Sequence, residues 1–171
     1  VLMTTGSGCA LFDYDNDGWL DAFLVNGTEL DKQGLPKAEG ATHHALFHNE
    51  GDGTFKNVTN AAGITRATYG QGCSTADFDG DGFIDLYITN YGPNQLYRNR
   101  GDGTFEDVTE HSGTGDPRWS AGGVFLDYDD DGDLDLYVTN YLKFRVDIEG
   151  VNASALSKRM GFRSFPGPRD Y

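Results

Sequence analysis

Cysteine, proline and basic residues are all scarce in this chain of 171 residues, which has 2 Cys, 5 Pro and 13 Lys plus Arg against 27 Asp plus Glu. Two cysteines are too few for a disulfide framework. The formal net charge of -14 disfavours binding to nucleic acid or to an anionic membrane surface, because both are negatively charged. The excess of acid favours bound cations instead. No apolar run is long enough to span a membrane.

Helical periodicity is nearly absent as well, and the segment Asn152–Met160 is the one place where the sequence predicts a short helix. The first residues, V-L-M-T-T-G-S-G-C, have neither a basic nor an apolar region typical of a signal peptide, so we expect the chain to begin inside a longer protein. Cys9 and Cys73 each precede an acidic motif by four residues. This equivalence predicts two buried small side chains rather than a disulfide.

An acidic motif occurs three times, as D-Y-D-N-D-G-W-L-D from Asp13, D-F-D-G-D-G-F-I-D from Asp77 and D-Y-D-D-D-G-D-L-D from Asp127. Each copy has Asp at positions 1, 3, 5 and 9 and Gly at position 6. Carboxylates on alternate residues of a tight loop can converge on one hard cation, and calcium accepts six to eight oxygens at flexible angles. The motif therefore predicts three calcium ions, with the aromatic residue at position 2 facing away from the ion and packing.

The predicted ligands are the side chains at positions 1, 3, 5 and 9 and the backbone carbonyl at position 7. They are Asp13, Asp15, Asp17, Trp19 (carbonyl) and Asp21; Asp77, Asp79, Asp81, Phe83 (carbonyl) and Asp85; and Asp127, Asp129, Asp131, Asp133 (carbonyl) and Asp135. Asp130 is expected to point to solvent. An EF-hand would need Glu at position 12, where the three copies have Leu24, Ile88 and Val138.

A second motif, L-F-H-N-E-G-D-G-T-F-K-N-V-T from Leu46, recurs as L-Y-R-N-R-G-D-G-T-F-E-D-V-T from Leu96, 50 residues later. Asp77 and Asp127 are also 50 residues apart, whereas Asp13 and Asp77 are 64 apart. The first repeat therefore carries an extra polar segment between Thr28 and His44, which is predicted to be a surface loop. Short β-branched and aromatic runs flank the acidic motifs, and G-D-G-T-F is typical of a hairpin turn. About four strands in roughly 50 residues is the length of a propeller blade.

The two motifs together resemble the FG-GAP/VCBS repeats of integrin-type β-propellers. The resemblance is closer to the cartilage acidic protein-like (ASPIC/UnbV) branch, on the segments Gly6 to Gly18, Leu96 to Thr109 and Gly167 to Tyr171. It implies an all-β, calcium-binding propeller of about seven blades that is usually secreted or on the cell surface.

The chain holds about two and a half four-stranded blades of such a propeller, with the calcium loops between the first two strands of each blade. We expect one partial domain: repeat 1 over 6–64, repeat 2 over 70–113, an incomplete repeat 3 over 120–141, and an unrepeated insertion over 142–171. Repeat units bury their faces against their neighbours, so the missing blades of a parent chain are expected partners.

Several smaller motifs have ordinary structural interpretations. Arg100-Gly101-Asp102 spells an adhesion tripeptide but reads as part of a hairpin turn. Of the clustered histidines, His48 is predicted on a surface strand and His43 and His44 in a loop, rather than at a zinc site. The sequons at Asn26, Asn57 and Asn152 are short enough to arise by chance.

The sequence predicts a non-enzyme, because no nucleophile motif or phosphate loop occurs and the carboxylates are committed to metal. Its function is predicted to be that of an extracellular, periplasmic or cell-surface interaction or adhesion scaffold with structural calcium, binding a protein or glycan. The alternative is a non-catalytic module attached to a secreted enzyme, for example one acting on polysaccharide.

Overall fold

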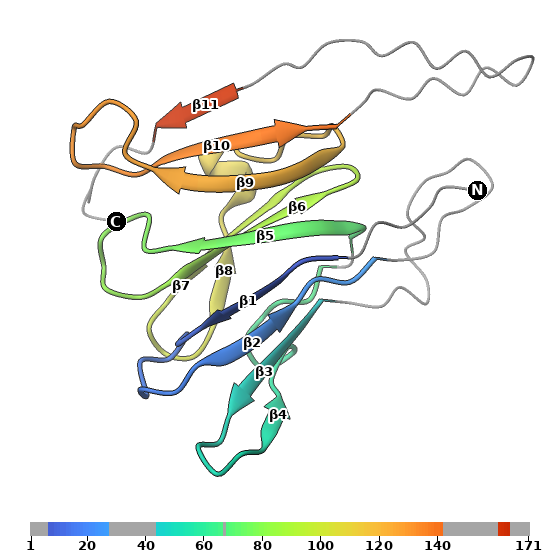
Figure 1. Cartoon of the computed structure of the whole chain (residues 1–171), viewed down its shortest axis with the longest axis vertical. Helices are drawn as coiled ribbons and strands as arrows, with labels where there is room; N and C mark the ends of the chain where they lie inside the picture. The colour runs from blue at the N-terminus through green and yellow to red at the C-terminus, as the bar shows by residue number, and fades with distance from the viewer. Residues whose placement is uncertain (1–6, 28–43, 67, 142–160, 165–171) are drawn as a thin grey trace, which may run out of the picture.

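The computed structural model describes residues 7–27, 44–66, 68–141 and 161–164. They form three antiparallel sheets with very little helix, as the sequence predicted (Figure 1). The predicted loop between Thr28 and His44, the predicted helix Asn152–Met160, His43, the sequon at Asn152 and the final G-P-R-D-Y lie outside the described residues.

The first and second sheets each have four strands in sequence order, and the third has three. The first sheet contains β1 (Cys9–Phe12), β2 (Asp21–Leu24), β3 (Ala45–Asn49) and β4 (Phe55–Asn57). The second contains β5 (Gly70–Ala76), β6 (Asp85–Asn90), β7 (Gln95–Asn99) and β8 (Phe105–Asp107). The third contains β9 (Ser120–Leu126), β10 (Asp135–Asn140) and β11 (Gly161–Ser164), in the order β11-β10-β9.

Two elements were not predicted from the sequence. The helix α1 (Thr109–Ser112) is a single turn that ends at Gly113, where φ is 66°, and four residues are too few to produce a hydrophobic period. The strand β11 pairs with β10 from within the segment that does not repeat, so it occupies the place that β3 and β7 hold in the other sheets. No helix in the described part of the chain is long and apolar enough to cross a membrane.

The first strands of the three sheets lie side by side, with β5 between β1 and β9 (Figure 1). Glycine allows this approach: a Cβ on Gly8 would lie 3.0 Å from the Cα of Gly72. The Ser74 hydroxyl also donates a short hydrogen bond to the carbonyl of Gly123, joining β5 to β9. Sheets that meet along their first strands are consistent with a partial β-propeller.

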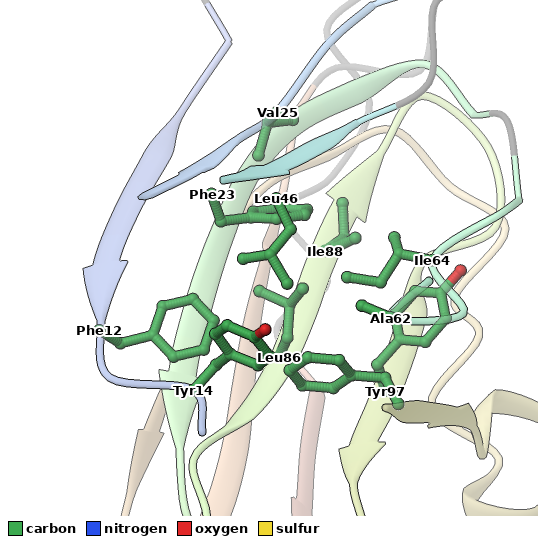
Figure 2. Packing of buried hydrophobic residues seen from close by; sticks show 11 residues of the cluster. Phe12, Tyr14, Phe23, Val25, Leu46, Ala62, Ile64, Leu86, Ile88 and Tyr97 are labelled. Carbon is green, nitrogen blue, oxygen red and sulfur yellow. The ribbon is translucent and has the colours of Figure 1, made fainter. Parts of the chain in front are cut away.

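Apolar side chains fill the spaces between neighbouring sheets. They form two separate cores, because successive side chains of β6 point to opposite faces of the second sheet. Leu86 and Ile88 face the first sheet, while Tyr87 faces the third. The core between the first and second sheets, shown in Figure 2, comprises Phe12, Tyr14, Phe23, Val25, Leu46, Ala62, Ile64, Leu86, Ile88, Tyr97 and Phe105. The core between the second and third sheets is smaller and contains Tyr87, Leu96, Leu136 and Val138.

The two cysteines are free, as predicted, but the prediction that both are buried is wrong, because Cys9 is exposed and Cys73 is only partly buried. Cys73 packs against the core between the first two sheets, and burial raises the pKa of its thiol to about 11. Cys9 occupies the equivalent position in the first sheet, on a face that no other sheet of the described residues covers. Its side chain is therefore exposed.

Candidate metal centres

The three acidic motifs form loops that join the first two strands of each sheet, on one side of the molecule (left in Figure 1). The aspartate at position 1 organises each loop. In the first, Asp13 accepts hydrogen bonds from the backbone N–H groups of Asp17 (3.1 Å) and Gly18 (2.9 Å). Asp77 and Asp127 accept the two equivalent bonds in their loops. The loop geometry is thus built into the chain by side chain-to-backbone bonds.

Position 4 of each loop has a left-handed backbone, a feature that the sequence analysis missed. Asn16, Gly80 and Asp130 have φ values of 58°, 73° and 61°. Asn, Gly and Asp are the residues that tolerate this conformation most readily. Asp130 is exposed, as predicted, and its left-handed backbone also contributes to the turn of the third loop.

The aspartate at position 9 is buried and ties the loop to the sheet. Asp21 is fully buried and accepts hydrogen bonds from the N–H groups of Tyr14 (3.1 Å) and Asn49 (2.8 Å). Asp85 is also fully buried and accepts the equivalent bonds from Phe78 (2.9 Å) and Asn99 (2.7 Å). Burial raises the pKa of Asp85 to about 7, although both hydrogen bonds oppose that shift.

The carboxylates at positions 1, 3 and 9 converge in every loop. One oxygen from each lies within 4.8 Å of the others in the groups Asp13–Asp15–Asp21, Asp77–Asp79–Asp85 and Asp127–Asp129–Asp135. Burial, followed by the neighbouring position-5 carboxylate, raises the pKa of the position-3 aspartate in all three loops. Negative charge is therefore crowded at three equivalent points, as a cation site requires.

The position-5 aspartates lie outside these three groups. Asp17, Asp81 and Asp131 instead accept a hydrogen bond from the backbone N–H at position 7, at 2.8, 3.0 and 2.9 Å. Asp17 also forms a second group with Asp15 and His48. The ligand roles of all four aspartates and of the position-7 carbonyls remain predictions.

The aromatic residue at position 2 packs in two of the three loops. Tyr14 is buried and stacks on Phe105 of the second sheet, with ring centroids 6.1 Å apart. Phe78 stacks on Phe125 of the third sheet at 6.4 Å. The prediction is wrong for Tyr128, which is 64% exposed because no described sheet follows the third.

The G-D-G-T-F segments form the predicted hairpins between β3 and β4 and between β7 and β8. Asp102 of the adhesion-like tripeptide accepts hydrogen bonds from the N–H (3.0 Å) and hydroxyl (2.5 Å) of Thr104, while Arg100 forms an ion pair with Glu106. These contacts support the interpretation of the tripeptide as turn structure.

The hairpins also contact the acidic loops, which the sequence analysis did not anticipate. A Cβ on Gly51 would lie 2.9 Å from the indole nitrogen of Trp19, and one on Gly101 would lie 2.5 Å from the ring of Phe83. The position-7 aromatic residue thus rests on the first glycine of the hairpin in both complete repeats.

Two asparagines of the second motif hold the loops in place. Asn49 donates a side-chain hydrogen bond to the carbonyl of Leu20 (3.0 Å). Asn99, its equivalent, donates to the carbonyls of Ile84 (3.1 Å) and Tyr14 (2.7 Å), so it links the loops of two sheets. The recurrence of this Asn in both copies of the motif was the signal that could have revealed its role.

The described histidines differ from the prediction in their surroundings. His44 lies outside a strand, as expected, but it is buried and accepts a hydrogen bond from the N–H of Asn26. His48 lies on β3, as expected, but its side chain faces the first acidic loop, within 3.4 Å of Asp15 and 3.3 Å of Asp21.

Comparison with known proteins agrees with this architecture. A family model described as FG-GAP-like repeat matches residues 13–88 and 77–138. Because these matches cover more than half of the chain, the protein belongs to the FG-GAP-like repeat family.

Three relatives share a stretch of 53 residues with the chain, and all are cartilage acidic protein 1. The proteins from Homo sapiens, Mus musculus and Xenopus tropicalis are 43%, 42% and 40% identical over that stretch. It covers 30% of this chain and 8% of each relative. The resemblance to the cartilage acidic protein-like branch is confirmed over this segment.

Proposed function

We propose that each acidic loop binds one calcium ion and that the three ions hold the sheets of a non-catalytic repeat module in shape. The observation that carries this proposal is the threefold convergence of the carboxylates at positions 1, 3 and 9. The donor set consists of hard oxygen atoms, which calcium prefers. In the first loop, Asp15 Oδ1 is buried and accepts no hydrogen bond, so it is available to a cation.

The structural role follows from the contacts of each loop. Positions 1 and 9 are already fixed by backbone N–H groups, so an ion bound there would connect a loop to the buried start of β2, β6 or β10. It would also neutralise the crowded carboxylates that otherwise repel each other. Binding to the folded chain and not to the unfolded one converts binding free energy into folding free energy.

The repeat family and the cartilage acidic protein relatives favour an extracellular interaction scaffold. Calcium sites of modest affinity suit a compartment in which calcium is abundant. The partner would be a protein or glycan that contacts the loops and faces of the sheets, as in other scaffolds where loops carry recognition. Attachment of the same non-catalytic module to a secreted enzyme is the second candidate.

Thermal unfolding tests the calcium role. The chain, stripped of metal by EGTA, is compared with the same chain after calcium is restored. We expect calcium to raise the Tm and magnesium at the same concentration to raise it less, because magnesium demands octahedral geometry and gives up its water reluctantly. Equal Tm values with calcium and with EGTA would contradict a structural role for the ion.

A further inference from the structure

His48 faces the first acidic loop from β3, so this loop has a nitrogen donor beside its oxygens. Its Nδ1 atom lies 3.4 Å from Asp15 Oδ2 and 3.3 Å from Asp21 Oδ1, and its Nε2 atom lies 3.9 Å from Asp17 Oδ2. The imidazole is 20% exposed, and the ring of Tyr14 packs edge-on against it at 6.0 Å. The side chain is therefore held in position beside the loop.

His48 Nδ1 and Asp15 Oδ1 are buried and form no hydrogen bond, although Nδ1 lies beside the carboxylates of Asp15 and Asp21. The equivalent pair in the second loop, Asp79 Oδ2 and Arg98 Nε, also forms no hydrogen bond, but there the two atoms contact each other as an ion pair. A buried polar atom usually has a partner, because leaving it unpaired costs free energy. A metal ion placed between this imidazole nitrogen and the carboxylate oxygens would be coordinated by both kinds of atom.

We propose that the first loop can also form a mixed nitrogen–oxygen site for a transition-metal dication such as Zn²⁺, with His48, Asp15 and Asp17 as ligands, because one atom from each lies within 4.8 Å of the others. Zinc ligands at about 2.1 Å in tetrahedral geometry lie about 3.4 Å from one another, and His48 Nδ1 lies 3.4 Å from Asp15 Oδ2. Imidazole nitrogen favours zinc, copper and nickel over calcium. The inference rests on the proposed function in one respect, namely that the acidic loops bind cations.

The second loop provides a natural contrast, because Arg98 stands where the first repeat has His48. Its Nε atom lies 2.5 Å from Asp79 Oδ2, and its second terminal nitrogen lies 3.2 Å from Asp81 Oδ2. A guanidinium has donors but no lone pair to offer a metal. The metal-ligating group found in the third loop contains aspartates alone. Among the described loops, nitrogen ligation is thus a property of the first.

Calorimetric titration of Zn²⁺ into the calcium-free chain tests this assignment, because zinc and calcium would compete for Asp15 in the first loop. The wild type is compared with His48→Asn, which keeps a polar side chain of similar size, and with Arg98→His, which places an imidazole beside the second loop. We expect His48→Asn to weaken zinc binding by at least about tenfold and Arg98→His to add a second zinc site. Co²⁺ substituted for zinc should show a visible spectrum that changes in His48→Asn.

The outcomes separate this inference from the proposed function. Zinc binding of equal affinity in the wild type and in His48→Asn would overturn the inference, even where calcium still stabilises the chain. Absence of calcium binding at every loop, together with zinc binding that depends on His48, would refute the calcium proposal and leave the mixed site standing. Circular dichroism of both variants confirms that each is folded before titration.

Discussion

The first and second sheets have the same strand order and nearly the same motifs, yet their side chains are buried to very different extents. Phe105 is 5% exposed, whereas its equivalent in the first sheet, Phe55, is 50% exposed. Ile88 is fully buried, whereas Leu24 is 43% exposed. The second sheet lies between two others, while one face of the first has no neighbour among the described residues. Burial in this fold is therefore decided by the adjacent sheet, not by the repeat itself.

The acidic loops of the two sheets differ in a parallel way. Their backbones and aspartates are equivalent, but a histidine faces the first loop and an arginine faces the second. The repeat thus keeps the loop geometry and varies the group opposite it. Both differences can be tested with matched substitutions at equivalent positions.

The largest effect is expected for truncation of the equivalent phenylalanines. Phe105→Ala should lower the free energy of unfolding by about 3–5 kcal/mol, because it leaves a cavity beneath Tyr14. Phe55→Ala should cost about 1 kcal/mol or less, because half of its side chain is already in water. Urea unfolding of both variants measures the difference. Equal losses would mean that the open face of the first sheet is covered in solution.

Removal of one loop's calcium is expected to have the next largest effect. Asp79→Ala should eliminate binding at the second loop, and Asp15→Ala at the first, with two ions remaining in each case. At a calcium concentration of 100 times Kd, each lost ion removes about 2.7 kcal/mol of stabilisation. Calorimetric stoichiometry is the measurement. Loss of all three ions from a folded variant would show that the loops are coupled, not independent.

The paired asparagines should give a smaller difference. Asn99→Ala removes three side-chain hydrogen bonds, two donated to the carbonyls of Tyr14 and Ile84 and one accepted from the N–H of Gly101. It leaves the buried carbonyl of Tyr14 without its donor, so we expect a loss of about 1–3 kcal/mol. Asn49→Ala removes two side-chain hydrogen bonds, an exposed one to the carbonyl of Leu20 and one from the N–H of Gly51, and should cost about 0.5–1.5 kcal/mol. Chemical denaturation in saturating calcium compares them. A larger loss for Asn49→Ala would contradict the link between loops that Asn99 provides.

Arg98→Ala should have the smallest effect on stability and a distinct effect on calcium. The Arg98 side chain is 31% exposed, and its partners Asp79 and Asp81 are 10% and 29% exposed, so loss of these ion pairs should change the free energy of unfolding by about 1 kcal/mol. Calcium should bind the second loop more tightly in this variant, because a competing positive charge is gone. A titration followed by calorimetry detects the change, and weaker calcium binding would show that Arg98 supports the site.

Much of the fold could be predicted because the motifs that mark its strands and turns occur in both complete repeats. The recurrence of D-x-D-x-D-G and G-D-G-T-F fixes where strands and turns begin, and the structure confirms these elements in both complete repeats. β11 could not be predicted in this way, since its segment has no second copy. The exposure of Cys9 and Tyr128 also escaped prediction, because it depends on which sheets stand beside them.

The spacing of the aspartates predicted where the candidate sites lie. It did not predict that the aspartates within one loop have different structural roles. Spacing alone treats the aspartates at positions 1, 3, 5 and 9 as equal ligands. In the structure, the carboxylates at positions 1, 3 and 9 converge. The aspartate at position 9 is buried and, as Asp85 shows, accepts hydrogen bonds from backbone N–H groups of two segments. The approach of His48 to the first loop depends on the pairing of β2 with β3, which brings residues 27 positions apart in the sequence to the same place.

The central claim is that an ion sits among the carboxylates at positions 1, 3 and 9 of each loop. A crystal structure of the chain grown with calcium, with anomalous data collected at long wavelength, tests it most directly. We predict an anomalous peak in all three loops, ringed by oxygens at about 2.3–2.6 Å. Well-ordered loops with no peak between those carboxylates would contradict the account.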